Sequence, residues 1–154
     1  MFWPGSDRRE VAAAGRGWLG STQPLISYRM PITHTVDHTV HAMTAIADGP
    51  ITLQDVRRHL EEERREAGLS YAELIDARGA IPSVSPADVR SLVGLLRDLA
   101  STQPLGPTAV IVSTDYAYGV MRMLSMLVED ICAVRPFRSI QEAERWLQSP
   151  AEAA

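Results

Sequence analysis

A short run of β-branched and aliphatic residues, Thr108–Val112 (TAVIV), restricts the folds open to this chain more than any other segment. Side chains of a strand point alternately to the two faces of its sheet, so an uninterrupted apolar strand must be covered on both faces. Such strands are typical of α/β proteins, in which helices pack on each side of a parallel sheet. We therefore predict that residues 108–112 form a central parallel strand.

The segments around this run alternate between strand and helix patterns. We expect strands over residues 26–35, 39–47, 71–77 and 132–137, and helices that begin after Thr52, Ser85 and Ser139, with another from about Tyr116 to Val128. A polar turn at Asp37 and His38 joins the first two strands into a hairpin, and Asp48–Pro50 is expected to end the second strand. The order β-β-α-β-α-β-α-β-α predicts one α/β domain with a mixed five-stranded sheet and about four helices.

Helical periodicity predicts which faces of two helices are buried. In the helix after Thr52, the residues expected to face the core are Leu53, Val56, Leu60 and Ala67, and the charged residues between them are expected to be solvated. In the helix after residue 115, the expected inward residues are Tyr116, Ala117, Val120, Met123, Leu124, Leu127 and Val128. Tyr118, Arg122 and Met126 are spaced by four and are expected to point outward, as a row suited to binding.

Length and composition bound the domain and its partners. A chain of 154 residues fits one domain, which we place at residues 25–149, with a Gly- and Pro-containing flexible leader at 1–24 and a short tail at 150–154. The net charge of -4 argues against a nucleic-acid partner and allows at most peripheral membrane contact. The single Cys132 forms no internal disulfide, and the chain lacks a long apolar run, so we expect a cytoplasmic protein.

Residues that carry chemistry are sparse. The string His34–His41 (HTVDHTVH) holds most of the histidines, but hairpin geometry favours surface histidines over a metal site, so no metal is predicted. Neither a G-x-S-x-G motif nor a phosphate-binding glycine loop occurs. We therefore expect no catalytic residues and no cofactor.

Three strings resemble a bacterial SpoIIAA-like family with the STAS-type fold. They are LIDARGA (Leu74–Ala80), AVIVSTDYAYGVMRML (Ala109–Leu124) and VRPFRSIQEAERWL (Val134–Leu147), the last being similar to the family's terminal F-R-x-x-x-E-A-x-x-W-L pattern. The resemblance spans about Ile26 to Gln148. It implies a regulatory interaction module that is usually not an enzyme, and this branch is also similar in fold to CRAL-TRIO lipid-transfer proteins.

The resemblance also implies a candidate modification site. Sporulation anti-sigma factor antagonists carry a phosphorylatable serine in a D-S-x-G element at the start of the second helix, and Ser85 is the position here that could inherit it. This chain lacks the Asp before and the Gly after that serine. Ser85 is therefore either a phosphosite or simply a helix cap.

Loops that follow parallel strands meet at one edge of a sheet, where open α/β sheets place ligands. We expect that edge to gather Asp76, Arg78, Ser85, Ser113 and Asp115 as a polar docking rim, beside the outward row Tyr118, Arg122 and Met126. The sequence favours a non-catalytic module that binds another protein or a second copy of itself. The alternatives are a carrier of a lipid or other apolar small molecule, and an enzyme of unknown reaction.

Overall fold

The computed structural model describes residues 30–149, and these form a five-stranded sheet in the order β1-β2-β3-β4-β5. The strands are β1 (Ile32–Asp37), β2 (Ala42–Ile51), β3 (Ala72–Pro82), β4 (Thr108–Ile111) and β5 (Val134–Phe137). β1 pairs antiparallel with β2, and every other neighbouring pair is parallel. The predicted α/β class, element order and mixed sheet are therefore confirmed.

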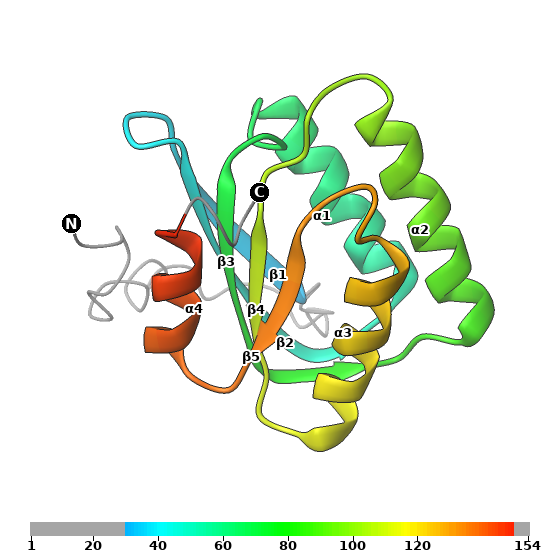
Figure 1. Cartoon of the computed structure of the whole chain (residues 1–154). Helices are drawn as coiled ribbons and strands as arrows, with labels where there is room; N and C mark the ends of the chain where they lie inside the picture. The colour runs from blue at the N-terminus through cyan, green and yellow to red at the C-terminus, as the bar shows by residue number, and fades with distance from the viewer. Residues whose placement is uncertain (1–29, 150–154) are drawn as a thin grey trace, which may run out of the picture.

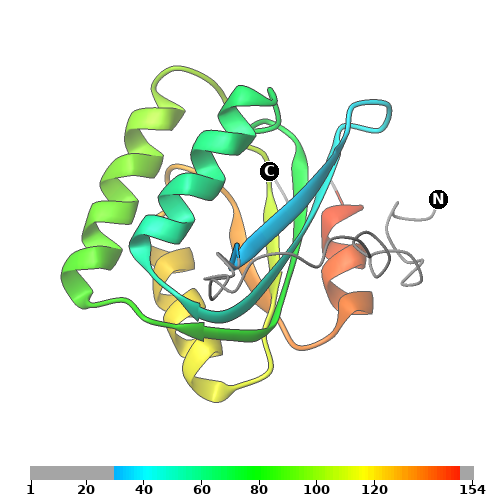
Figure 2. The same ribbon diagram turned by 180° about the vertical axis from the view of Figure 1, so that it is seen from behind.

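Four helices cover the two faces of this sheet unequally. The helices are α1 (Leu53–Arg65), α2 (Pro86–Ala100), α3 (Asp115–Leu127) and α4 (Ile140–Leu147). Helices α1, α2 and α3 lie on one face and α4 alone lies on the other, as the two opposite views show (Figure 1, Figure 2). Right-handed crossovers between parallel strands that advance in one direction place their helices on one face, which explains this arrangement.

Strand β4 is not the central strand of the sheet but an interior one between β3 and β5, and it packs on both faces, as its composition predicts. Ala109 and Ile111 pack in one core with Leu74, Trp146 and Leu147, on the side of α4. Val110 lies in the opposite core with Ala77 and Ala117, on the side of the three helices. The apolar run is thus explained by its position between two helical layers.

Local capping sets where the helices begin. Thr52 and Ser85 form reciprocal capping boxes with Asp55 and Asp88 at the starts of α1 and α2. Ser139 accepts a hydrogen bond from the backbone N–H of Glu142 at the start of α4. These side chains satisfy amide groups that the helix itself leaves unpaired, so the predicted starts at 52, 85 and 139 are correct.

Strands β2 and β3 are longer than predicted. Asp48–Pro50 does not end β2, because beyond Ala47 the strand has no β1 neighbour and proline is tolerated on such an edge. A bulge between Ile46 and Asp48 and a positive φ of 77° at Gly49 adapt the chain to this path. Strand β3 likewise continues beyond its predicted end at Ala77, since Gly79 pairs with Asp48 in the extended ladder.

Several predictions fall outside the described residues. The leader at 1–24, the tail at 150–154 and residues 26–29 of the expected first strand all lie there. Within residues 30–149, β1 begins at Ile32. No helix in that range is both long enough and apolar enough to cross a membrane.

Two glycines provide a matched test of this packing. A Cβ at Gly106 would lie 2.1 Å from the carbonyl oxygen of Tyr71, whereas a Cβ at Gly94, on exposed α2, would meet nothing within 4 Å. We expect Gly106→Ala to lower the free energy of unfolding by about 1–3 kcal/mol. Gly94→Ala should raise it by about 0.5–1 kcal/mol, because alanine is the better helix former. Urea denaturation of both variants checks this, and equal effects would contradict the described packing.

Candidate functional site

The predicted rim is divided into two groups. In the first, Asp76 and Arg78 both lie in β3 and form an ion pair of 2.6 Å between Oδ2 and Nη2. Asp76 pairs with Ile111, the last residue of β4, so this group lies level with the carboxyl end of β4. The Ser113 hydroxyl, just beyond that end, donates a hydrogen bond of 2.6 Å to the carbonyl of Arg78. The sheet thus brings these three predicted residues together.

The second group lies at the start of α3. Arg138 donates a hydrogen bond of 2.6 Å to Asp115, and its guanidinium lies 4.7 Å from the centre of the Tyr118 ring. Tyr118 is therefore half-buried beneath Arg138, and the prediction that it points freely outward is wrong. Arg122 and Met126 are exposed on α3, as predicted.

Ser85 was predicted to be either a phosphosite or a helix cap, and in the structure it caps α2. Its Oγ accepts a hydrogen bond of 3.1 Å from the backbone N–H of Asp88, and its own N–H donates to the Asp88 carboxylate. The residue is exposed. Phosphorylation of Ser85 stays a prediction.

Helix α3 exposes much more apolar surface than its periodicity predicts. Tyr116 is 60% exposed, Met126 64% and Leu127 46%. Tyr116, Met123 and Leu127 were expected to face the core, and all three are exposed. The reason is the position of α3 beside β5, the last strand of the sheet, because the short β5 leaves only the face with Ala117, Leu124 and Val128 something to pack on. We call the exposed face, made of Tyr116, Gly119, Met123, Met126 and Leu127, the α3 stripe.

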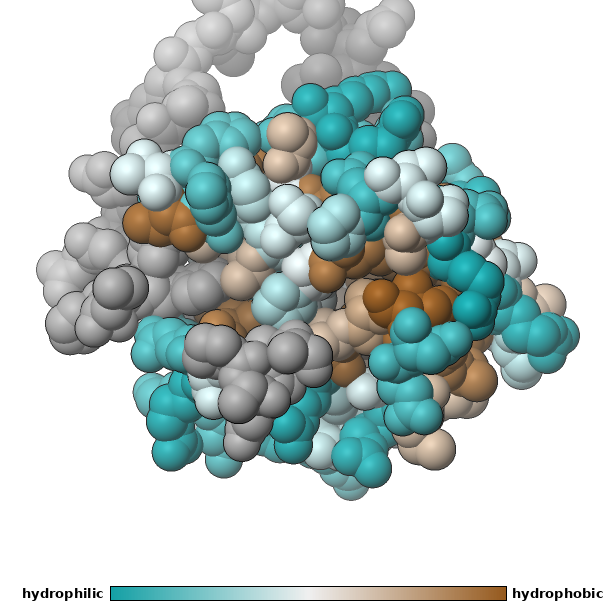
Figure 3. All heavy atoms as spheres, turned by 45° about the horizontal axis from the view of Figure 1, so that its top comes forward, coloured by the Kyte–Doolittle hydropathy of each residue, from teal (hydrophilic) through white to brown (hydrophobic). Residues whose placement is uncertain are grey.

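Hydrophobic side chains also show at the amino ends of the parallel strands. Figure 3 looks onto that end, and hydrophobic side chains there lie between hydrophilic ones instead of forming one continuous face. In the part of the chain that the structure describes, the amino ends of the strands therefore present no continuous apolar surface like that of the α3 stripe.

An apolar cavity of about 170 Å³ lies between the sheet and helices α1–α3. Its lining includes Ala77 and Val110 of the sheet, Leu92 of α2, and Ala117 and Met121 of α3. Small alanine side chains on the sheet leave this space, because they fill less volume than the branched residues usual in such cores. A carrier of a lipid chain is expected to hold a cavity of several hundred Å³, and this cavity is smaller than that.

The side of α1 that faces the sheet carries charged residues. Within the described residues, the buried residues of α1 are His59 and Glu63, whereas Leu53, Val56 and Leu60 are only half-buried. The prediction that apolar residues form the buried face of α1 is therefore wrong, because His59 and Glu63 occupy the centre of that face. Ala67 lies beyond the end of the helix and is exposed. The solvated charged face is also only partly correct, since Glu61 pairs with Arg64 and Arg65 on the surface but Glu63 does not.

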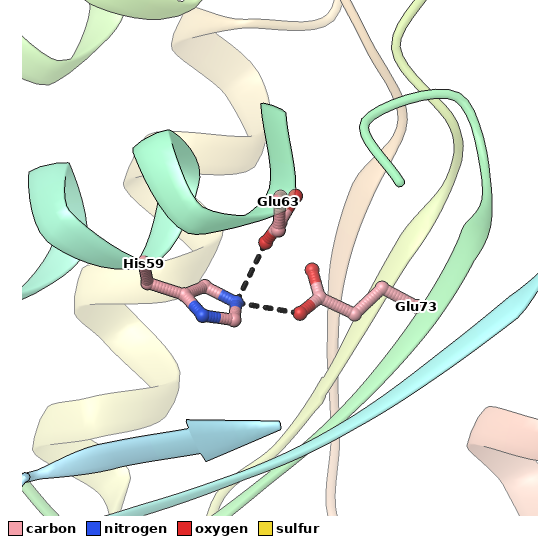
Figure 4. Close-up of side chains that lie close together, drawn as sticks. All are labelled: His59, Glu63 and Glu73. Carbon is pink, nitrogen blue, oxygen red and sulfur yellow. Dashed lines mark hydrogen bonds and ion pairs between the residues drawn. The ribbon is translucent and has the colours of Figure 1, made fainter. Parts of the chain in front are cut away.

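Glu73 of β3 completes a buried group with these two residues, which we call the α1–β3 cluster (His59, Glu63 and Glu73). Each residue is 5% exposed, and the His59 Nε2 lies 2.6 Å from Glu63 Oε1 and 2.7 Å from Glu73 Oε1. Figure 4 shows the two carboxylates converging on one ring nitrogen from α1 and from the strand. The sequence alone does not predict that these three residues come together. The only signal was the spacing of four between His59 and Glu63, which places them on one helix face.

The hairpin histidines behave differently from one another. His34 faces α1, with its Nε2 3.0 Å from Glu66 Oε1, and its side chain is only 8% exposed. His38 and His41 are exposed and contact Tyr71, by a hydrogen bond of 2.8 Å and by ring stacking at 5.0 Å. The prediction of surface histidines is therefore correct for His38 and His41 and wrong for His34, which pairs with Ala45 across the hairpin and not with His41.

Comparisons with known proteins identify the fold. No family model matches the chain, and no curated protein matches it. Among solved structures, an uncharacterised DUF3478-family protein from Shewanella loihica PV-4 with a SpoIIAA-like fold superposes with a TM-score of 0.51. The match covers 75% of this chain and 93% of that one, at 14% sequence identity. This protein has a SpoIIAA-like fold. The sequence resemblance predicts that fold correctly, and an identity of 14% extends the likeness no further than the fold.

The α1–β3 cluster has unusual proton affinities. Burial lowers the pKa of His59, but the adjacent Glu63 and Glu73 carboxylates outweigh this and raise it to about 10. Burial and the neighbouring Glu73 carboxylate raise the pKa of Glu63 to about 7. The other titratable ring against His59 is His34 from β1, at 5.2 Å between ring centres.

These shifts predict how stability depends on pH. Both groups keep their protons in the folded state at pH values where the unfolded chain loses them, between 4.5 and about 7 for Glu63 and between 6.5 and about 10 for His59. The free energy of unfolding should therefore fall as pH rises from about 5 to 10, because the folded state binds more protons. Urea denaturation across this range, with EDTA in every buffer, measures it.

Two variants make this test specific. Glu63→Gln should flatten the lower part of the pH dependence, and His41→Gln, at an exposed hairpin position, should leave the shape of the pH dependence unchanged. A wild-type stability that stays constant or rises over this range would contradict the described cluster.

Proposed function

We propose that the protein is a non-catalytic interaction module that pairs with a second copy of itself through the α3 stripe. The observation that carries this proposal is the exposure of Tyr116, Met123, Met126 and Leu127 on one helix. Exposed apolar side chains are unremarkable singly, but a contiguous group indicates a contact surface. Tyr and Met are also enriched in such surfaces.

The spacing of the stripe suits helix pairing. At about 100° per residue, Tyr116, Met123 and Leu127 lie within an arc of roughly 40°, with Gly119 and Met126 beside them. A Cβ at Gly119 would meet nothing within 4 Å, so the middle of the stripe is open. Another helix can approach closely there, because glycine has no side chain to hold it away.

A second copy of the chain is the occupant that this pattern favours. In a two-fold interface the same patch contacts itself, so a patch must be complementary to its own image. In an antiparallel pair of α3 helices, Tyr116 of one copy meets Leu127 of the other, and Met123 of one copy lies against the open position Gly119 of the other. The stripe is uncharged, so this pairing buries no unpaired charge.

The rim supports a non-catalytic role. Asp76 and Asp115, the carboxylates at the carboxyl end of the sheet, are each held by an arginine, Arg78 and Arg138. A general acid or base must be within reach of the proton that it transfers, and each of these carboxylates already contacts a guanidinium. The rim therefore fits docking better than proton transfer.

Substitutions in the stripe test the pairing. We expect wild-type protein to form dimers at micromolar concentrations, and Met123→Arg and Leu127→Arg to weaken association at least tenfold, because each buries a charge in the interface. Sedimentation equilibrium measures the dimer constant, and circular dichroism verifies that each variant is folded.

The matched control is Ile81→Arg, which changes a residue that is 60% exposed on β3, away from α3. It should leave association unchanged. A wild-type protein that stays monomeric, or an Ile81→Arg variant that dissociates as much as Leu127→Arg, would refute pairing through the α3 stripe.

The apolar cavity favours a second candidate function, the binding of a small apolar molecule. Its volume of about 170 Å³ is close to that of an engineered cavity of about 150 Å³ in another protein that binds benzene. A compact ring of that size fits, and a fatty-acyl chain does not. Among the apolar ligands that the sequence allows, the cavity therefore favours a small compact molecule over a lipid.

Benzene provides a direct probe of the cavity. We expect saturating benzene to raise the melting temperature of the wild type, since a ligand that binds only the folded state stabilises it. Ala117→Leu, which fills the cavity, should abolish the shift, and Ala87→Leu, on exposed α2, should retain it. A wild type without any shift would eliminate this candidate.

A further inference from the structure

The α1–β3 cluster leaves polar atoms without hydrogen-bond partners. His59 Nε2 has one N–H to donate, and two carboxylate oxygens lie 2.6 and 2.7 Å from it. The contact with Glu73 is a hydrogen bond, whereas Glu63 Oε1, 2.6 Å away, is buried and accepts no hydrogen bond from the described residues. His59 Nδ1 is also buried without a partner among the described residues. Buried polar groups in folded proteins are nearly always satisfied, so these atoms call for an explanation.

The charge of the cluster is a second feature that needs an explanation. Two buried carboxylates face one imidazole, and an unpaired carboxylate in a low-dielectric interior is strongly disfavoured. Replacing both glutamates by apolar residues would remove this penalty, yet the chain brings them together from α1 and β3. A divalent cation at the point where the three side chains converge would balance the charge of both carboxylates.

We propose that the α1–β3 cluster binds a divalent transition-metal cation through His59 Nε2 and one carboxylate oxygen each from Glu63 and Glu73. The three ligand atoms lie within 4.8 Å of one another. Metal–ligand bonds of about 2.0–2.2 Å require neighbouring ligand atoms roughly 3 to 3.5 Å apart, so small side-chain movements suffice.

The ligand set indicates the class of cation. One imidazole nitrogen with two carboxylate oxygens suits Zn²⁺ and its first-row neighbours, whereas Mg²⁺ and Ca²⁺ prefer oxygen ligands alone. Glu63 Oε1, which accepts no hydrogen bond, is then satisfied by the metal.

A second layer of side chains connects the cluster to the surface. The His34 ring meets the His59 ring edge-on at 5.2 Å between centres, and it contacts Glu62 and Glu66 of α1. Exposure increases outward along this path, from 8% at His34 to 29% at Glu62 and 48% at Glu66. Acidic side chains at the outer end raise the local cation concentration, which provides the entry path that a buried site needs.

Zinc binding by the full chain, carrying no histidine tag, tests the proposal. After treatment with EDTA and desalting, titration calorimetry with ZnCl₂ should show one ion bound per chain. His59→Gln and Glu73→Gln should each weaken the affinity at least tenfold, because each removes a ligand. His38→Gln and Glu61→Gln, matched exposed positions, should stay within twofold of the wild type.

If a variant does not fold, Co²⁺ binding to the wild-type protein provides a second test of the site. Co²⁺ added to wild-type protein should bind once per chain, and X-ray absorption at the cobalt edge should show nitrogen and oxygen ligands with a single imidazole. A wild type that binds no metal, a site with two or more imidazoles, or an affinity lost in His38→Gln instead of His59→Gln would overturn the assignment.

Discussion

The contact on which the arrangement of this molecule depends is the attachment of α1 to the sheet through buried charged side chains. His59 and Glu63 of α1 converge with Glu73 of β3, and His34 of β1 reaches Glu62 and Glu66 of the same helix. Polar contacts of this kind are directional, so they fix the position of a helix more narrowly than apolar packing does. Helix α1 in turn supplies one wall of the apolar cavity through Leu53 and Val56. The cavity and the cluster are therefore two consequences of one helix position.

The sequence predicts the features that depend on neighbouring residues. Thr52 and Ser85 cap helices because each bonds an amide three positions away, and the run Thr108–Val112 requires cover on two faces. The sequence mispredicts the burial of side chains whose neighbours in space are distant along the chain. Periodicity treats Glu63 as solvated because nothing nearby indicates that Glu73 arrives from β3 to meet it. It treats Tyr116 and Leu127 as buried because it does not show that α3 lies beside the last strand.

The two sheet faces suit different tasks. On one face, α4 is held by Trp146 and Leu147, which are buried against Leu74 and Ile111. On the other face, α3 turns Met123, Met126 and Leu127 outward, and α1 turns ionisable groups inward. This molecule thus exposes apolar side chains of α3 and buries a charged cluster on the same side of its sheet. The proposed cation binding at α1 and the proposed pairing at α3 use different helices and different residues.

Native mass spectrometry of the untagged chain, purified without chelators and sprayed from a zinc-containing volatile buffer, tests this account most directly. One spectrum reports both the number of chains in the complex and the mass bound to each. The account predicts a dimer that carries one metal ion per chain, and conversion of that dimer to metal-bound monomer by Leu127→Arg. A bare monomer for the wild type at micromolar concentration would contradict both the pairing through α3 and the cation site beneath α1.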